Sequence, residues 1–77
     1  MHRKELIREV ALSSERIQMD TAAAVSAVFD VIKETLVRGE VVDIPYFGRF
    51  EVKIRNGVKS PAFVPHKDLK LIIKYDL

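Results

Sequence analysis

The sequence has no cysteine and no tryptophan, and only three glycines and three prolines among its 77 residues. Without cysteine there is neither a disulfide framework nor a thiolate metal site, a composition typical of a reducing compartment such as the cytoplasm. The start of the chain predicts no secretory leader, because Met1–Glu5 runs directly into an amphipathic pattern. No apolar run is long enough to predict a membrane span. We therefore expect a cytoplasmic protein.

The length of the chain predicts a single domain, residues 1–77, with a small core. A domain of this size buries only about 60% of the surface that its unfolded chain exposes. Since a disulfide is excluded, oligomerisation is the remaining common way to stabilise it. The net charge is only +2, which does not by itself predict nucleic-acid binding. Such a prediction has to rest on where the basic residues lie in the fold.

Two helices are predicted in the first half of the chain. The first is short and amphipathic and ends at Ser13-Ser14; its apolar residues, at helical spacing, are Leu6, Ile7, Val10 and Ala11. The second runs from about Gln18 to Arg38 and has Gly39 as a left-handed C-cap. Its apolar surface is wider than the roughly 100° stripe of an ordinary surface helix, which predicts burial on more than one side. A second copy of the chain would cover it economically, and a membrane-seeking helix is the alternative.

An antiparallel sheet is predicted next. Val41–Ile44 is a short β-branched run that Pro45 ends. From Phe50 to Arg55 apolar and charged residues alternate strictly, which places one set on a core face and the other on an outer face. Asn56-Gly57 favours a two-residue type I′ turn, and counting back from it sets Phe50 opposite Phe63. Such a cross-strand pair contributes about 0.2–1 kcal/mol over alanine.

The C-terminal segment predicts a third helix opened by Pro65. Its apolar face comprises Leu69, Ile72 and Ile73, and its basic face comprises Lys67, Lys70 and Lys74. The expected fold is therefore α+β: two helices, a three-stranded antiparallel sheet with a tight hairpin, and a short last helix. Phe47, Phe50 and Phe63 are expected in the core, and not as a base-stacking platform.

Residues spread over almost the whole chain resemble the HU and integration host factor family of bacterial DNA-bending proteins. They occur in the family's order, without a gap from the start to Arg55. They are Lys4-Glu5-Leu6-Ile7 with Val10-Ala11, Ala24-Val25 with Ala27-Val28-Phe29-Asp30 and Ile32, Leu36, Gly39-Glu40, Phe47-Gly48 with Phe50-Glu51-Val52, Arg55, and Pro61-Ala62-Phe63 with Lys67 and Leu69-Lys70.

The resemblance implies an intertwined dimer around the second helix, with two β-ribbon arms that reach around DNA. In the family, a proline near each arm tip wedges between base pairs and kinks the duplex. Only five residues separate Arg55 from Pro61 here, so we expect a tight hairpin in place of the arm. Pro61 matches a proline of the family's last body strand, not the wedge. Smaller departures are Tyr46, where the family usually has glycine, and Glu15–Ile17, where it usually has a glycine-containing turn.

The resemblance also implies which residues bind DNA, because five basic residues match positions that face phosphates in the family. They are Arg3, Lys53, Arg55, Lys67 and Lys70. We expect binding of double-stranded DNA without sequence preference, with strong salt dependence, little bending and weaker affinity than an armed relative. The alternative for Lys53 and Arg55, and equally for the helix lysines, is an ordinary solvated face. Arg49 and Lys59 lie near the same surface but match the family less well.

Catalysis has little support in the sequence. His2 and His66 are isolated, and neither a nucleophile triad, a metal-protease motif nor a glycine-rich phosphate loop is present. We expect a non-enzyme without cofactor, metal or small-molecule substrate: a nucleoid-associated homodimer. The alternative is a dimerising interaction protein that has lost DNA binding, or that forms a heterodimer with an armed HU-type partner and modulates it.

Overall fold

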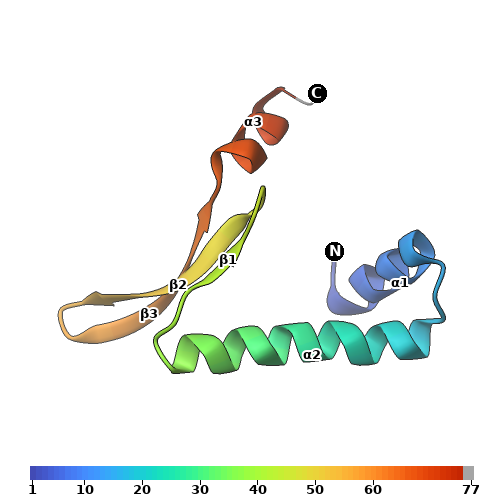
Figure 1. The fold of residues 1–77 in the computed structure, drawn as a ribbon, viewed down its shortest axis with the longest axis horizontal. Coiled ribbons are helices and arrows are strands. Elements are labelled where there is room, and N and C mark those ends of the chain that lie inside the picture. The colour runs from blue at the N-terminus through green and yellow to red at the C-terminus, as the bar shows by residue number, and fades with distance from the viewer. Residues whose placement is uncertain (76–77) are drawn as a thin grey trace. The chain divides into compact units, whose positions relative to one another are not determined.

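A computed structural model describes residues 1–75 of the chain. Its elements follow in the order α1 (Arg3–Ser14), α2 (Gln18–Val37), β1 (Val42–Ile44), β2 (Gly48–Arg55), β3 (Val58–Pro65) and α3 (Lys67–Tyr75) (Figure 1). This order confirms the predicted α+β class. The chain divides into two compact units, Met1–Val31 and the part from Ile32 onward, and the division lies within α2.

The first unit contains α1 and most of α2, and small residues are its most buried ones. Ala11 on α1 and Thr21 on α2 are each only 3% exposed. The Thr21 hydroxyl donates a hydrogen bond to the Ile17 carbonyl oxygen at 3.0 Å, so its burial leaves no unsatisfied polar group. The Arg3 guanidinium at the start of α1 donates a hydrogen bond to Ser26 Oγ on α2.

Both long helices end in a left-handed residue. After α2, Gly39 has φ +79°, its N–H bonds the Leu36 carbonyl at 2.9 Å, and the Glu40 N–H bonds the Thr35 carbonyl at 3.1 Å. This is the Schellman arrangement that the glycine predicts, although α2 ends at Val37 and Arg38 lies just beyond its last turn. After α1 the left-handed position is occupied by Glu15, with φ 57°.

The sheet has the order β1-β2-β3, with both pairs antiparallel. Arg55 pairs with Val58 across the turn, and Phe50 pairs with Phe63, as predicted. Asn56 and Gly57 have φ values of 51° and 76°. Positive φ at both central residues is what a type I′ turn requires, so the tight hairpin in place of an arm is confirmed.

The aromatic cluster explains why residue 48 is a glycine. The Phe63 ring lies 5.0 Å from the Phe50 ring and 5.4 Å from the Phe47 ring, centroid to centroid. A Cβ at Gly48 would lie 2.5 Å from the Phe63 ring and 2.8 Å from the Val64 carbonyl oxygen. Gly48 therefore allows the ring to lie directly on the strand. Phe47 and Phe63 nevertheless remain about two-fifths exposed within this chain, so the predicted core is covered on one side only.

Two local predictions are corrected. Pro65 does not open the last helix; it is the last residue of β3 and pairs with Gly48, because the proline φ suits an extended strand as well as a helix start. Ile54 lies on the predicted face, with Phe50 and Val52, but it is 66% exposed and so is not buried within this chain. β1 pairs only with Gly48–Phe50 of β2, so it ends well short of Ile54.

Apolar surface is left uncovered along the described chain. Large apolar side chains that remain exposed include Leu12, Met19, Val28, Val31, Val37, Ile72 and Ile73. No helix in residues 1–75 is long and apolar enough to cross a membrane. Uncovered apolar area of this extent in a small domain marks a protein interface.

The left-handed Glu15 generates a stability prediction. Replacing Glu15 with glycine removes the Cβ strain of that conformation, and we expect the free energy of unfolding to rise by about 0.5–1 kcal/mol. Glu9→Gly is the matched control, since it removes the same charge from the interior of α1 and should lower stability by about as much. Urea unfolding followed by circular dichroism measures both. A Glu15→Gly variant that is less stable than the parent would contradict a strained left-handed conformation at residue 15.

Candidate nucleic-acid interface

The two faces of the β2–β3 hairpin differ in charge. Cross-strand partners share a face, and Lys53 pairs with Ser60 while Arg55 pairs with Val58. Lys53 and Arg55 therefore lie together on the outer face near the turn, and both are exposed. Lys59 pairs with Ile54 and so lies on the opposite face. The predicted pair of cations is confirmed as neighbours on one surface; that this surface contacts DNA stays a prediction.

An ion pair lies on the same outer face. The Arg49 Nε is 3.1 Å from a Glu51 carboxylate oxygen, and the Glu51 side chain is 20% exposed. Among residues 1–75, neither Lys53 nor Arg55 has a salt bridge or hydrogen bond of its side chain to another residue. The positive charge at the turn end of the hairpin is therefore available, whereas Arg49 is largely compensated by Glu51.

Lys67 and Lys70 lie at the other end of the sheet. Both are exposed and belong to the first turn of α3, which starts directly after β3. β3 runs eight residues from Val58 at the turn to Pro65. At about 3.3 Å per residue, the positions of Lys53 and Arg55 lie about 17–23 Å along the sheet from the end of β3. The second unit thus presents two separate basic sites, not one cluster, because α3 and the β2–β3 turn lie at opposite ends of β3 (Figure 1). Arg3 belongs to the first unit, where its guanidinium is engaged by Ser26.

The sequence analysis missed a connection between the start of α3 and the β1–β2 turn. The His66 N–H donates to the Phe47 carbonyl oxygen at 3.0 Å, and His66 Nε2 lies 2.5 Å from an Asp43 carboxylate oxygen. The two partners are 23 residues apart in sequence, so no local pattern reveals the contact. The one available signal is Asp43 itself, a carboxylate in the middle of an otherwise β-branched strand.

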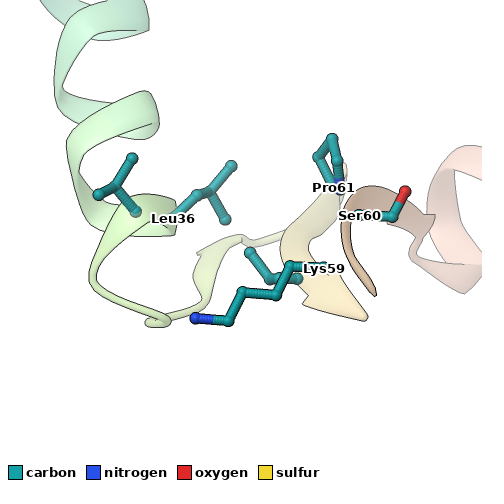
Figure 2. A pocket seen from close by; sticks show the side chains of 6 residues that line it. Leu36, Lys59, Ser60 and Pro61 are labelled. Atoms are coloured by element: carbon teal, nitrogen blue, oxygen red, sulfur yellow. The ribbon is translucent and has the colours of Figure 1, made fainter. Parts of the chain in front are cut away.

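The opposite face of the hairpin contributes to an apolar pocket of about 360 Å³. It is lined by Leu36, Val37, Val52, Lys59, Ser60 and Pro61, and Figure 2 shows these side chains on the end of α2 and on the hairpin. Small-molecule sites combine an apolar lining with several convergent polar groups. Here the lining is mostly aliphatic and continues the uncovered apolar surface of α2.

Comparison with known proteins agrees with this architecture. The family described as bacterial DNA-binding protein matches residues 1–61. The prophage-derived DNA-binding protein HU 2 of Bacillus subtilis is 38% identical over 96% of this chain and 98% of its own length. The chain belongs to the HU family. DNA-binding protein HU of Geobacillus stearothermophilus is likewise 38% identical, over 96% of this chain and its whole length.

Solved structures of HU proteins have the same fold. HU from Thermotoga maritima matches with a TM-score of 0.84 and 36% identity, over 95% of this chain and 98% of its own. An Anabaena HU–DNA cocrystal structure matches with a TM-score of 0.86 over 97% of this chain and 99% of its own. The latter is only 21% identical, so it shows a shared fold alone.

The alignments also show how much shorter this chain is. The alignment with the Bacillus subtilis relative spans 90 positions, to which this chain contributes 96% of its 77 residues, or about 74. About 16 positions therefore have no counterpart here. In this chain the β2–β3 hairpin closes with a two-residue turn at Asn56-Gly57.

Proposed function

We propose that this HU-family chain binds double-stranded DNA without sequence preference, through phosphate contacts made by the body of a dimer and with little or no intercalative bending. The observation that supports this most directly is the hairpin itself. It ends in a two-residue turn, and its outer face presents Lys53 and Arg55, exposed and without an ion pair within residues 1–75. The proposed role is architectural and not enzymatic, in the bacterial nucleoid.

Phosphate contacts account for the expected lack of sequence preference. Lysine and arginine side chains that neutralise phosphates release condensed counterions, a term that is independent of sequence and falls steeply with salt. Lys53 and Arg55 provide one such site, and Lys67 and Lys70 provide another at the far end of the sheet. Arg3 would add a third contact from α1. Within the second unit, two basic sites at opposite ends of one sheet suit a duplex lying along it.

The shortened hairpin removes the means of kinking. Proteins that wedge a side chain between base pairs offset a few kcal/mol of unstacking by wrapping more surface around the bent duplex. Here the strand ladder closes at Arg55 and Val58, and Pro61 pairs with Val52 inside it. Neither a wedge nor a wrapping ribbon is available in the described hairpin. DNA binding by this chain therefore has to proceed on nearly straight duplex.

The dimer follows from the uncovered apolar surface. Ala11 and Thr21 are the only side chains of residues 1–75 that are nearly fully buried. Removal of apolar surface from water contributes roughly 25 cal/mol per Å² to the free energy of folding. A lone chain leaves most of its apolar surface in water and so does not gain this contribution. We propose that a second copy covers α2 and the apolar face of the sheet. A heterodimer with an armed HU-type chain would use the same surface, and is the alternative function.

The dimer proposal predicts that stability depends on protein concentration. When folding is coupled to association, the Tm rises as the protomer concentration rises. Calorimetry or circular dichroism over a hundredfold concentration range should therefore show a steadily rising Tm, and analytical ultracentrifugation should give twice the 8.8 kDa chain mass. A Tm independent of concentration, together with an 8.8 kDa species, would rule the dimer out.

The DNA proposal predicts the effect of removing the exposed cations. The double variant Lys53→Gln, Arg55→Gln deletes two positive charges from the outer face of each chain of the dimer. The slope of log affinity against log salt should become shallower by about 0.9 for each phosphate that the variant no longer neutralises. Fluorescence anisotropy of a labelled duplex at several salt concentrations measures the slope.

Lys59→Gln provides the matched control for this experiment. It removes one charge from the same hairpin but from the opposite face, so its slope should stay close to that of the parent. Equal effects of the two variants would show that net charge, and not the outer face, determines binding. A parent protein that shows no salt-dependent binding at all would instead favour the interaction-protein alternative.

The missing wedge predicts a nearly unbent complex. Energy transfer between dyes at the two ends of a duplex of about 30 base pairs should change little on saturation with this protein. Wedge-bearing minor-groove proteins kink DNA by about 20–90° and would raise the transfer strongly, so an armed HU serves as positive control. A comparable rise with this chain would require a wedge that the hairpin does not provide.

A further inference from the structure

Tyr46 occupies a backbone conformation that usually belongs to glycine. The Phe47 N–H donates to the Ile44 carbonyl oxygen at 3.1 Å, which closes a four-residue turn between β1 and β2. Pro45 is the second residue of this turn, and Tyr46, the third, has φ 65°. A turn with proline second and positive φ third is of type II, for which glycine is favoured at the third position. A tyrosine there destabilises the turn.

The Tyr46 side chain offers nothing within this chain to offset that cost. It is 75% exposed. Its ring takes part in none of the aromatic contacts among residues 1–75, and its hydroxyl has no hydrogen bond there. Residues held in sparsely populated backbone conformations cluster at functional sites, which makes Tyr46 a candidate for a functional contact.

The surroundings of the turn indicate what that contact is. The hydrogen bond from the His66 N–H to the Phe47 carbonyl sets the turn against the start of α3, where Lys67 and Lys70 are exposed (Figure 1). The nearby Asp43 carboxylate is paired with His66. Asp68 is the one acidic residue in the first turn of α3, so the two lysines outnumber it. The turn that carries the exposed Tyr46 is therefore joined through Phe47 and His66 to a helix start with an excess of positive charge, which suits a polyanion.

We propose that Tyr46 is a further DNA-contacting residue. Its hydroxyl donates a hydrogen bond to a phosphate oxygen, and its ring lies against the adjacent sugar of the strand that Lys67 and Lys70 hold. Tyrosine hydroxyls are among the side-chain groups that position proteins on DNA phosphates. The inference rests on the proposed DNA binding and adds a neutral contact to its cationic ones. It also assigns the Lys67–Lys70 end of the sheet to the duplex.

Tyrosine fluorescence can test the contact directly. The chain has no tryptophan and two tyrosines, Tyr46 and Tyr75, so Tyr75→Phe leaves Tyr46 as the only emitter. Addition of duplex DNA should change the emission of this variant at the same DNA concentrations that change the anisotropy of a labelled duplex. An unchanged emission at saturating DNA would overturn the proposal.

Affinity measurements separate the contact from its cationic neighbours. Tyr46→Phe should weaken binding about 2- to 5-fold, the amount expected for one hydrogen bond, and Tyr46→Gly should weaken it further. Both should leave the salt slope unchanged, because the phenol is neutral. Lys67→Gln is the comparison variant, and it should make the slope shallower.

Measurements of Tm and of dimer formation test whether a loss of DNA affinity in the Tyr46 variants has an indirect cause. Tyr46→Gly relieves the turn, so its Tm should rise while its DNA affinity falls, and a loss of affinity therefore does not reflect misfolding. Unchanged or improved affinity of Tyr46→Gly would overturn the contact while leaving DNA binding by Lys53 and Arg55 intact. A weaker dimer in Tyr46→Gly would assign the ring to the second copy instead. Failure of the parent to bind DNA would overturn the proposed function itself.

Discussion

The structure depends on apolar surface that a single chain cannot bury. α2 is apolar around most of its circumference, and residues such as Met19, Val28 and Val31 remain exposed in it. The chain has no disulfide with which to compensate for a small core. Local signals such as the Gly39 cap and the Asn56-Gly57 turn order the backbone, but they do not remove enough apolar area from water. Covering this apolar area is the part that the proposed dimer would play in stabilising the fold.

The hairpin has two faces of different character, one apolar and one basic. One face places Val52, Pro61 and Lys59 beside the end of α2, in the apolar pocket. The other face exposes Lys53 and Arg55. In a strand, successive side chains point to opposite faces. The apolar residues therefore stay on the pocket face, and the cations on the exposed face, only if the pairing register does not slip. The Asn56-Gly57 turn sets that register, and the Phe63 ring lying on Gly48 reinforces it at the far end of the ladder.

Sequence reasoning succeeded where the signal was local and periodic. The end of α1, the start of α2, the turn at Asn56-Gly57 and the pairing of Phe50 with Phe63 follow from spacing and turn chemistry, and the structure confirms them. It failed at Pro65, because a proline φ suits both a strand end and a helix start.

For the candidate site, the sequence correctly placed Lys53 and Arg55 on one face, since alternation determines faces. The place of Lys67 and Lys70 at the other end of the sheet follows from the length of β3. The sequence did not show that His66 contacts Asp43, because that contact joins segments 23 residues apart. The positive φ of Tyr46 was not predicted either, because residues other than glycine, asparagine and aspartate rarely adopt it.

The short β1 has a consequence for solubility. It covers only Gly48–Phe50, so within this chain the remainder of β2 has an open edge from Glu51 to Arg55. Open strand edges template intermolecular β-pairing, and charged side chains along them are a common safeguard. Glu51, Lys53 and Arg55 place such charges at every second position of that edge. These charges disfavour pairing of that part of β2 with a strand of another chain, and so oppose aggregation through it while the apolar surface is uncovered.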